Sequence, residues 1–71
     1  MDHAPVDSTS LASVGYDRAS AILEVQFRDS GDVYQYLDVP ETTYRALLAA
    51  ESLGRYFNRE IRGRYEYERV T

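Results

Sequence analysis

The stretch AILEVQFRDSGDVYQYLDVP, residues 21–40, decides the fold class of this chain. In its first part apolar and polar residues alternate, with Leu23, Val25 and Phe27 on one side, which is the two-residue period of a half-buried β-strand. Residues 29–32, Asp-Ser-Gly-Asp, are typical of a turn, and the run that follows is again rich in strand-forming residues. The stretch therefore predicts an antiparallel β-hairpin.

The length of the turn determines which residues of the hairpin face each other. A two-residue loop at 30–31 would pair Phe27 with Tyr34 and Val25 with Tyr36, which places both tyrosines on the apolar face. A three-residue loop would turn the tyrosines to the other face. We predict the two-residue loop, with the tyrosine rings packed as cross-strand neighbours.

Three apolar residues of the same stretch fall on the opposite side in this register. They are Ile22, Leu37 and Val39. This group is small, and a helix, the tail or a partner chain could cover it.

The segments on either side of the hairpin complete an α+β domain. Residues 11–16 alternate weakly and predict a first strand. Pro40 ends the last strand and suits the first turn of a helix, in which Tyr44, Leu47, Leu48 and Glu51 form one stripe.

A second helix is predicted from about Leu53 to Arg62. Ser52 is a good N-cap for it, and Gly63 occupies the position that commonly follows a helix. The predicted fold is a small three-stranded antiparallel β-meander followed by two C-terminal α-helices packed on the sheet.

The chain divides into three parts. Residues 1–9 carry no apolar period and predict a flexible N-terminal leader, which includes the single histidine, His3. Residues 10–65 form the folded domain, and residues 66–71 are a C-terminal tail or a short strand. We expect no catalytic or metal role for a lone imidazole in such a leader.

Composition excludes several classes of protein. The chain has 71 residues and no cysteine, so neither a disulfide framework nor a thiolate metal site can stabilise it. It has no apolar run of membrane-spanning length and no secretory signal at its start, so we expect a cytoplasmic protein. It also lacks a glycine-rich phosphate loop and a pair of carboxylates arranged for acid-base chemistry, so we expect neither an enzyme nor a cofactor.

Charge is distributed unevenly along the chain. The net charge is −4, yet residues 42–71 carry six arginines against four glutamates, whereas residues 1–41 carry two arginines against eight acidic residues. All eight cations are arginine, which suits bidentate contacts with phosphates and equally suits salt bridges with the protein's own carboxylates.

The second helix concentrates the candidate functional residues. At about 100° per residue, Arg55, Arg59 and Arg62 fall within roughly a 60° sector opposite the apolar stripe. An amphipathic helix with a solvated back explains this pattern, and so does a surface that binds nucleic acid. In the second interpretation Arg64 extends the basic surface, and Tyr56 or Tyr65 stacks on a base.

The start of this helix is a further candidate. Backbone amides at Ser52 to Gly54, with Arg55 beside them, could bind an anion such as a phosphate. A carboxylate from the protein itself, such as Glu51 or Asp38, could occupy the same place.

Several motifs together resemble the KTSC domain family, over about residues 8–65. They are Gly15-Tyr16, Leu23-x-Val25-x-Phe27, Gly31, Tyr34-Gln35-Tyr36, Val39-Pro40, Ala50-x-Ser52-x-Gly54 and Tyr56-Phe57-Asn58-x-x-Ile61-Arg62. The family occurs at the C-terminus of some lysyl-tRNA synthetases and as free-standing small bacterial proteins, and this chain looks like the latter. The resemblance implies RNA binding as a function and points to the motif residues Tyr34, Tyr36, Ser52, Gly54, Asn58 and Arg62.

Two hypotheses remain open at the level of sequence. The first is a non-catalytic module that binds RNA through the arginines and tyrosines of the second helix. The second is a protein-interaction module, or one that forms a homo-oligomer, through a strand edge or the group formed by Ile22, Leu37 and Val39.

Overall fold

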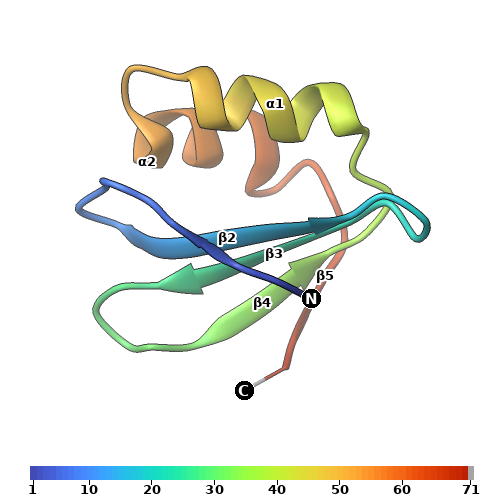
Figure 1. Ribbon diagram of the computed structural model, residues 1–71, viewed down its shortest axis with the longest axis horizontal. Helices are drawn as coiled ribbons and strands as arrows, with labels where there is room; N and C mark the ends of the chain where they lie inside the picture. Colours follow the sequence, from blue (N-terminus) through green and yellow to red (C-terminus); the bar gives the residue numbers. More distant parts are fainter. Residues whose placement is uncertain (71) are drawn as a thin grey trace.

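The computed structural model describes residues 1–70 and contains an antiparallel sheet with its helices on one face (Figure 1). The sheet has five strands in the order β1-β2-β3-β4-β5. The elements along the chain are β1 (Ala4–Pro5), β2 (Leu11–Asp17), β3 (Ile22–Phe27), β4 (Val33–Tyr36), α1 (Glu41–Ala49), α2 (Leu53–Tyr56), the π-helix η1 (Phe57–Ile61) and β5 (Tyr67–Arg69). The α+β class is confirmed.

The prediction of three strands is wrong, because each end of the chain adds one strand to the sheet. Residues 1–9, predicted as a leader, contribute β1, which pairs with β2, and β5 pairs with β4 at the opposite edge. Of the predicted tail, Thr71 lies outside the described residues. β1 has only two residues, too short for a sequence period to reveal, whereas β5 lies in the segment predicted as either a tail or a short strand.

Arg28 explains how the N-terminal segment is held in place. Its guanidinium group donates hydrogen bonds to the carbonyl oxygens of Ser8, Val6 and Leu11, at 2.8, 3.2 and 3.3 Å. These three bonds join the segment that leads into β2 to the end of β3, and they come from an arginine that sequence analysis left unassigned.

The register of the central hairpin differs from the predicted one by two residues. Val25 faces Tyr34 and Leu23 faces Tyr36. The loop is longer than expected, because Phe27 and Asp32 close it, with the amide of Phe27 donating to the Asp32 carbonyl oxygen at 2.9 Å. Gly31 adopts a φ of +74° within this loop. A shift of two residues preserves the face of every side chain, so the tyrosines still lie on the apolar face as predicted.

The core lies between the sheet and the helices, and nine residues form it: Leu11, Val14, Leu23, Val25, Tyr36, Val39, Leu47, Phe57 and Ile61. A bulge between Leu11 and Ser13 explains the weak alternation in β2, since it lets Leu11 and Val14 point into the same core although they are three residues apart.

The predicted apolar group on the far side of the sheet does not exist as such. Val39 is fully buried in the core, and only Ile22 and Leu37 remain half-buried elsewhere. The reason is Asp38, whose φ of +56° turns the chain after β4 and directs Val39 inward. The backbone there is tied to Ala21, whose carbonyl oxygen accepts from the amide of Val39 at 2.9 Å.

The helical region follows the prediction at its ends and departs from it in its middle. Ser52 caps α2 as expected, its hydroxyl oxygen accepting from the amide of Arg55 at 3.3 Å. From Phe57 the chain widens into a π-helix, in which the amide of Arg62 donates to the Phe57 carbonyl oxygen at 2.8 Å. Gly63 then takes a φ of +81°, in the position predicted to end the helix. In α1, Leu47 is buried but Leu48 is 44% exposed, so the predicted stripe is narrower than expected.

Candidate functional site

The π-helix divides the predicted arginine surface into two parts. A π turn closes its hydrogen bonds five residues apart instead of four, so residues after it are rotated relative to an α-helix. Arg55 and Arg59 line a groove beside the end of α1, whereas Arg62 lines a different cleft together with Asn58. We call the first surface, formed by Arg55, Tyr56 and Arg59, the arginine face.

Within the arginine face, the charged groups have different partners. The Arg59 guanidinium lies 5.8 Å from the centroid of the Tyr56 ring, and its Nε donates to Glu60 Oε2 at 2.9 Å. Arg64 also contacts Arg59, because its Nε donates to the Arg59 carbonyl oxygen at 3.1 Å. The Arg55 side chain is exposed and makes no hydrogen bond or ion pair with any of residues 1–70.

Ser52 and Ser10 contact the start of α2. Gly54 is buried, and a Cβ built there would lie 3.0 Å from Ser10 Oγ. The side chain of Ser52 accepts from the amide of Arg55, which follows the amides of residues 52–54 that were predicted to bind an anion, so anion binding there stays a prediction. Gly54 and Ser52 therefore have a packing role and a capping role in this structure.

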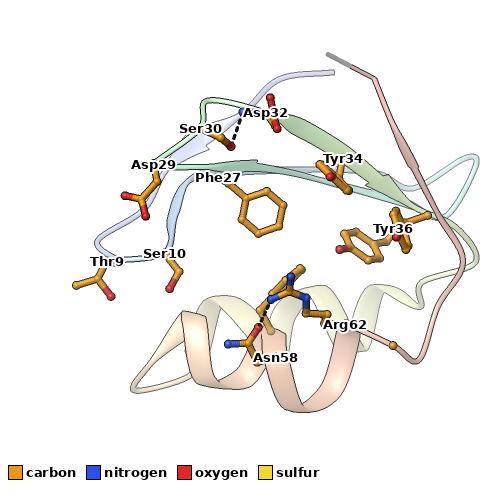
Figure 2. Close-up of a pocket in the computed structure, with 13 residues that line it drawn as sticks. Thr9, Ser10, Phe27, Asp29, Ser30, Asp32, Tyr34, Tyr36, Asn58 and Arg62 are labelled. Atoms are coloured by element: carbon orange, nitrogen blue, oxygen red, sulfur yellow. Dashed lines mark hydrogen bonds between the residues drawn. The ribbon is translucent and has the colours of Figure 1, made fainter.

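The second surface is a cleft between the β4 side of the sheet and η1, shown in Figure 2. Its volume is about 620 Å³. We call it the aromatic cleft, and its lining consists of Thr9, Ser10, Phe27, Asp29, Ser30, Asp32, Tyr34, Tyr36, Phe57, Asn58, Arg62, Gly63 and Tyr67. Figure 2 shows Phe27, Tyr34 and Tyr36 pointing from the sheet toward Asn58 and Arg62 of the helical segment.

Rings in contact form the floor of the aromatic cleft. Tyr34 stacks on Tyr67 with centroids 5.5 Å apart, and Phe27 meets Tyr34 edge to face at 5.3 Å. The ring centroids of Tyr36 and Tyr67 are 5.6 Å apart. Tyr36 is buried, and this burial raises the pKa of its hydroxyl, although the positive charge of Arg62 acts in the opposite direction. Tyr67 itself is 58% exposed and forms the outer end of this floor.

Polar groups form the two other sides of the cleft. Asn58 Oδ1 accepts a long hydrogen bond of 3.4 Å from Arg62, and both side chains are exposed. Across the cleft, the hairpin loop contributes Asp29 and Asp32. Asp32 is paired with Arg69 at 3.1 Å, whereas Asp29 makes no hydrogen bond or ion pair with any of residues 1–70.

Comparison with known proteins identifies the family to which this fold and these surfaces belong. The family model of the KTSC domain matches residues 7–65. The chain belongs to the KTSC domain family.

Relatives of this KTSC domain occur both alone and within a larger enzyme. An uncharacterized protein of Stutzerimonas stutzeri strain A1501 is 45% identical over 71 residues, which is 99% of each chain. A lysine-tRNA ligase of Trichormus variabilis is 39% identical over 56 residues, which is 79% of this chain and 10% of the ligase. The crystal structure of a KTSC domain protein from Yersinia pestis superimposes with a TM-score of 0.94 at 38% identity, covering 99% of this chain and 97% of that one.

The candidate residues of this KTSC domain do not form one continuous site. Arg55, Tyr56 and Arg59 lie together, with Ser52 at the end of the same groove. A second set, Asn58 and Arg62, lines the aromatic cleft. Tyr65 is half-buried and packs against the core.

Sequence analysis missed the cleft because its lining comes from segments far apart in the chain. Tyr67 was included only in the predicted C-terminal tail or short strand, residues 66–71, and Asp29 only as a turn residue. The signal that could have found Tyr67 is strand pairing. Tyr67 of β5 pairs with Tyr36 of β4, so a prediction that β5 pairs with β4 would have placed Tyr67 beside Tyr34 and Tyr36.

His3 was likewise missed as a residue with defined partners. Its Nδ1 lies 2.7 Å from Ser13 Oγ and its Nε2 lies 2.5 Å from Glu24 Oε1. Gln35 donates to the other oxygen of Glu24 at 2.7 Å, and Ser13 donates to Gln26 at 3.1 Å. These contacts form a polar network on the sheet face that the helices do not cover.

Residues 1–70 contain neither a candidate metal site nor a candidate membrane-spanning helix. They contain no group of three or more His, Cys, Asp or Glu side chains arranged to hold a metal ion. In the same part of the chain, no helix is long and apolar enough to cross a membrane.

Proposed function

We propose that this KTSC domain is a non-catalytic module that binds single-stranded RNA through the arginine face. The observation that carries the proposal is that Arg55, with no partner among residues 1–70, lies on the same exposed surface as Arg59, whose guanidinium is held over the Tyr56 ring. Guanidinium groups beside an aromatic ring provide a phosphate contact and a stacking surface in one place.

The relatives support an RNA partner in preference to another anion. Domains similar to this chain form a small part of lysine-tRNA ligases, which are proteins named for a tRNA substrate. Similar domains exist both alone and as a part of such an enzyme. This arrangement supports a role in binding, with catalysis carried out by the rest of the enzyme.

The negative net charge shapes the kind of binding that we expect. Most acidic residues belong to residues 1–41, while the arginine face belongs to the segment with an excess of arginine. A local positive surface on an acidic protein binds phosphates only where its arginines are directed, since the remaining surface repels them. Few phosphate contacts imply modest affinity and a shallow dependence on salt.

The test is a salt series with matched charge changes. Fluorescence anisotropy of a labelled short single-stranded RNA, between about 50 and about 200 mM salt, gives the affinity and its slope. In the double variant R55Q/R59Q we expect weaker binding and a slope smaller by about 1.4, since each single-strand phosphate contact contributes about 0.7.

The control removes the same charge from another surface. Arg18 and Arg45 both pair with Glu41 and are 76% and 73% exposed, so R18Q/R45Q changes the net charge equally. If both double variants weaken binding to the same extent, or if the wild-type protein does not bind RNA at physiological salt, the proposal is wrong.

A second candidate function is association through the edge strand β5. This strand lies at the edge of the sheet. Tyr67, its first residue, is 58% exposed, and Val70, which follows the strand, is 43% exposed. The opposite edge contains Pro5, which cannot donate a backbone hydrogen bond to a further strand. Light scattering at high concentration tests the self-association form: a dimer that V70K dissociates would support it, and a monomer would exclude it.

A further inference from the structure

We propose that the aromatic cleft binds one unpaired base of the RNA strand and prefers bases that carry an exocyclic amino group. This inference rests on the proposed function, which it deepens by naming a second contact and its base preference. The cleft is separate from the arginine face, although residues 53–62 contribute side chains to both surfaces.

The size and lining of the cleft suit a planar heterocycle. A volume of about 620 Å³ lies within the range of small-molecule sites in proteins. The floor presents the rings of Phe27, Tyr34 and Tyr67, and Tyr67 is exposed enough for a base to reach its face. Single-stranded bases bind on such aromatic surfaces because every base has a π-face.

The helical side of the cleft can bind the phosphate that accompanies the base. Among residues 1–70, the Arg62 side chain has one hydrogen bond, the long 3.4 Å contact with Asn58, so most of its donors remain available. The π turn rotates Arg62, which follows it, away from Arg55 and Arg59, and Arg62 lines the cleft together with Asn58. Single π turns inside helices are frequently found at functional sites.

The opposite side determines which base fits. Asp29 is exposed and makes no hydrogen bond or ion pair with any of residues 1–70, and it accompanies the hydroxyls of Ser10 and Ser30. An ionised carboxylate only accepts hydrogen bonds, so it favours the amino groups of adenine, cytosine or guanine. Uracil has no amino group, and its one donor on that edge, N3–H, lies between two carbonyl oxygens that repel a carboxylate. A carboxylate also repels a phosphate, which orients the nucleotide with its base toward Asp29 and its phosphate toward Arg62.

The charges on the two sides of the cleft therefore complement a single nucleotide, which has a negative phosphate and a base with hydrogen-bond donors. Arg62 lies on the helical side and Asp29 on the hairpin side, with the ring of Phe27 between them (Figure 2). A purely anionic ligand would meet Asp29 unfavourably, and a purely apolar one would leave both charged groups unpaired.

The experiment compares RNAs that differ only in base, with variants on each side of the cleft. Anisotropy is measured for labelled oligoadenylate, oligocytidylate and oligouridylate with the wild-type protein, D29N, R62Q and Y67A. We expect wild type to bind oligoadenylate and oligocytidylate about tenfold more tightly than oligouridylate, the effect of one charged hydrogen bond. D29N should remove most of that preference, whereas R62Q should weaken binding to all three RNAs and Y67A should do the same by loss of stacking.

Control variants separate these effects from general changes of charge. D7N removes one exposed carboxylate from another part of the chain, and R18Q/R45Q removes arginines that pair with Glu41. Asp29, Arg62 and Tyr67 are exposed, so their variants should fold, and circular dichroism of each variant verifies this.

The possible outcomes distinguish this inference from the proposed function. If RNA binds and R55Q/R59Q weakens it, but D29N, R62Q and Y67A change neither affinity nor base preference, the cleft proposal is overturned and the proposed function stands. If the cleft variants act as expected and R55Q/R59Q has no effect, the cleft proposal is supported and the proposal for the arginine face is wrong. Absence of binding to every RNA would overturn both.

Discussion

His3 lies against Glu24, with its Nε2 2.5 Å from the carboxylate oxygen Oε1, and this contact joins the N-terminal segment to the middle of the sheet. The side chains are 20% and 15% exposed, so the pair is shielded by its surroundings. A histidine that the sequence predicts to lie in a flexible leader is therefore part of the folded domain.

The first prediction concerns acid stability. Burial raises the pKa of Glu24, but hydrogen bonds from Gln35 and His3 and the positive charge of His3 outweigh it, so the pKa lies below its ordinary value. Because the folded pKa is lower than the unfolded one, ionised Glu24 stabilises the protein above about pH 4.5, and this contribution disappears as the pH falls through the folded pKa.

We therefore expect the free energy of unfolding of the wild-type protein to fall on acidification below about pH 4.5 more steeply than that of E24Q. Urea unfolding at a series of pH values measures both slopes. D7N is the control, since it removes an exposed carboxylate that makes no hydrogen bond or ion pair with any of residues 1–70. Equal slopes for wild type and E24Q would show that the pair contributes nothing to acid stability.

The second prediction concerns Gly15, which lies beneath the N-terminal segment. A Cβ at this position would lie 2.6 Å from the Asp2 carbonyl oxygen and 3.0 Å from His3 Cδ2, so G15A must displace that segment. We expect a destabilisation of about 1 to 3 kcal/mol, the usual cost of overpacking, in chemical denaturation.

Truncation provides the matched control for G15A. In a chain lacking residues 1–5 the added methyl group meets no backbone, so the same substitution should cost little. A similar cost in both backgrounds would mean that the N-terminal segment does not lie over Gly15 in solution.

The third prediction concerns the Tyr16 hydroxyl, which donates to the Val39 carbonyl oxygen at 2.6 Å. This bond holds the chain where it turns inward after Asp38. Y16F should destabilise the protein by about 0.5 to 1.5 kcal/mol through loss of this hydrogen bond.

Tyr44 offers a control for Y16F in the same ring pair. Its ring stacks on Tyr16 with centroids 5.0 Å apart, and its hydroxyl has no hydrogen-bond partner among residues 1–70. Thermal melts should show Y44F close to wild type. If Y44F is as destabilised as Y16F, the hydrogen bond to Val39 is not the cause.

The fourth prediction is a stabilising substitution at Ala21. This residue has a φ of +57°, a left-handed conformation that costs a residue with a Cβ roughly 1 to 2 kcal/mol. Glycine avoids that cost, but it raises the conformational entropy of the unfolded chain, which lowers stability by about 0.4 to 1 kcal/mol. On balance A21G should stabilise the protein by about 0.5 to 1 kcal/mol. A19G, in the adjacent turn outside any left-handed conformation, should be neutral or destabilising. A lower melting temperature for A21G would contradict the assigned backbone conformation.

Local chemistry made much of this fold predictable. Alternation of side chains defined β3 and its apolar face, Pro40 and Ser52 marked the starts of the two helices, and Gly63 marked the end of the second. The face of Tyr34 and Tyr36 was correct even though the register was not, because a shift of two residues leaves every side chain on the same side of the sheet.

Other features depended on contacts between distant segments. The two edge strands are two and three residues long, and they form because β2 and β4 offer them unpaired backbone groups, so sequence left β1 unpredicted and β5 as one of two alternatives. Val39 enters the core through the left-handed turn at Asp38, which no apolar pattern could indicate.

By itself, the sequence determined the α+β class, the hairpin and its buried face, the starts of both helices and the end of the second, since each depends on residues within a few positions of one another. Only the tertiary structure decided the strand number, the π turn that separates Arg62 from Arg55 and Arg59, and the aromatic cleft. The physical reason is that a cleft is lined by whatever side chains packing brings together: here Ser10, Asp29, Tyr34, Arg62 and Tyr67 come from five separate segments and meet only once the helices lie on the sheet.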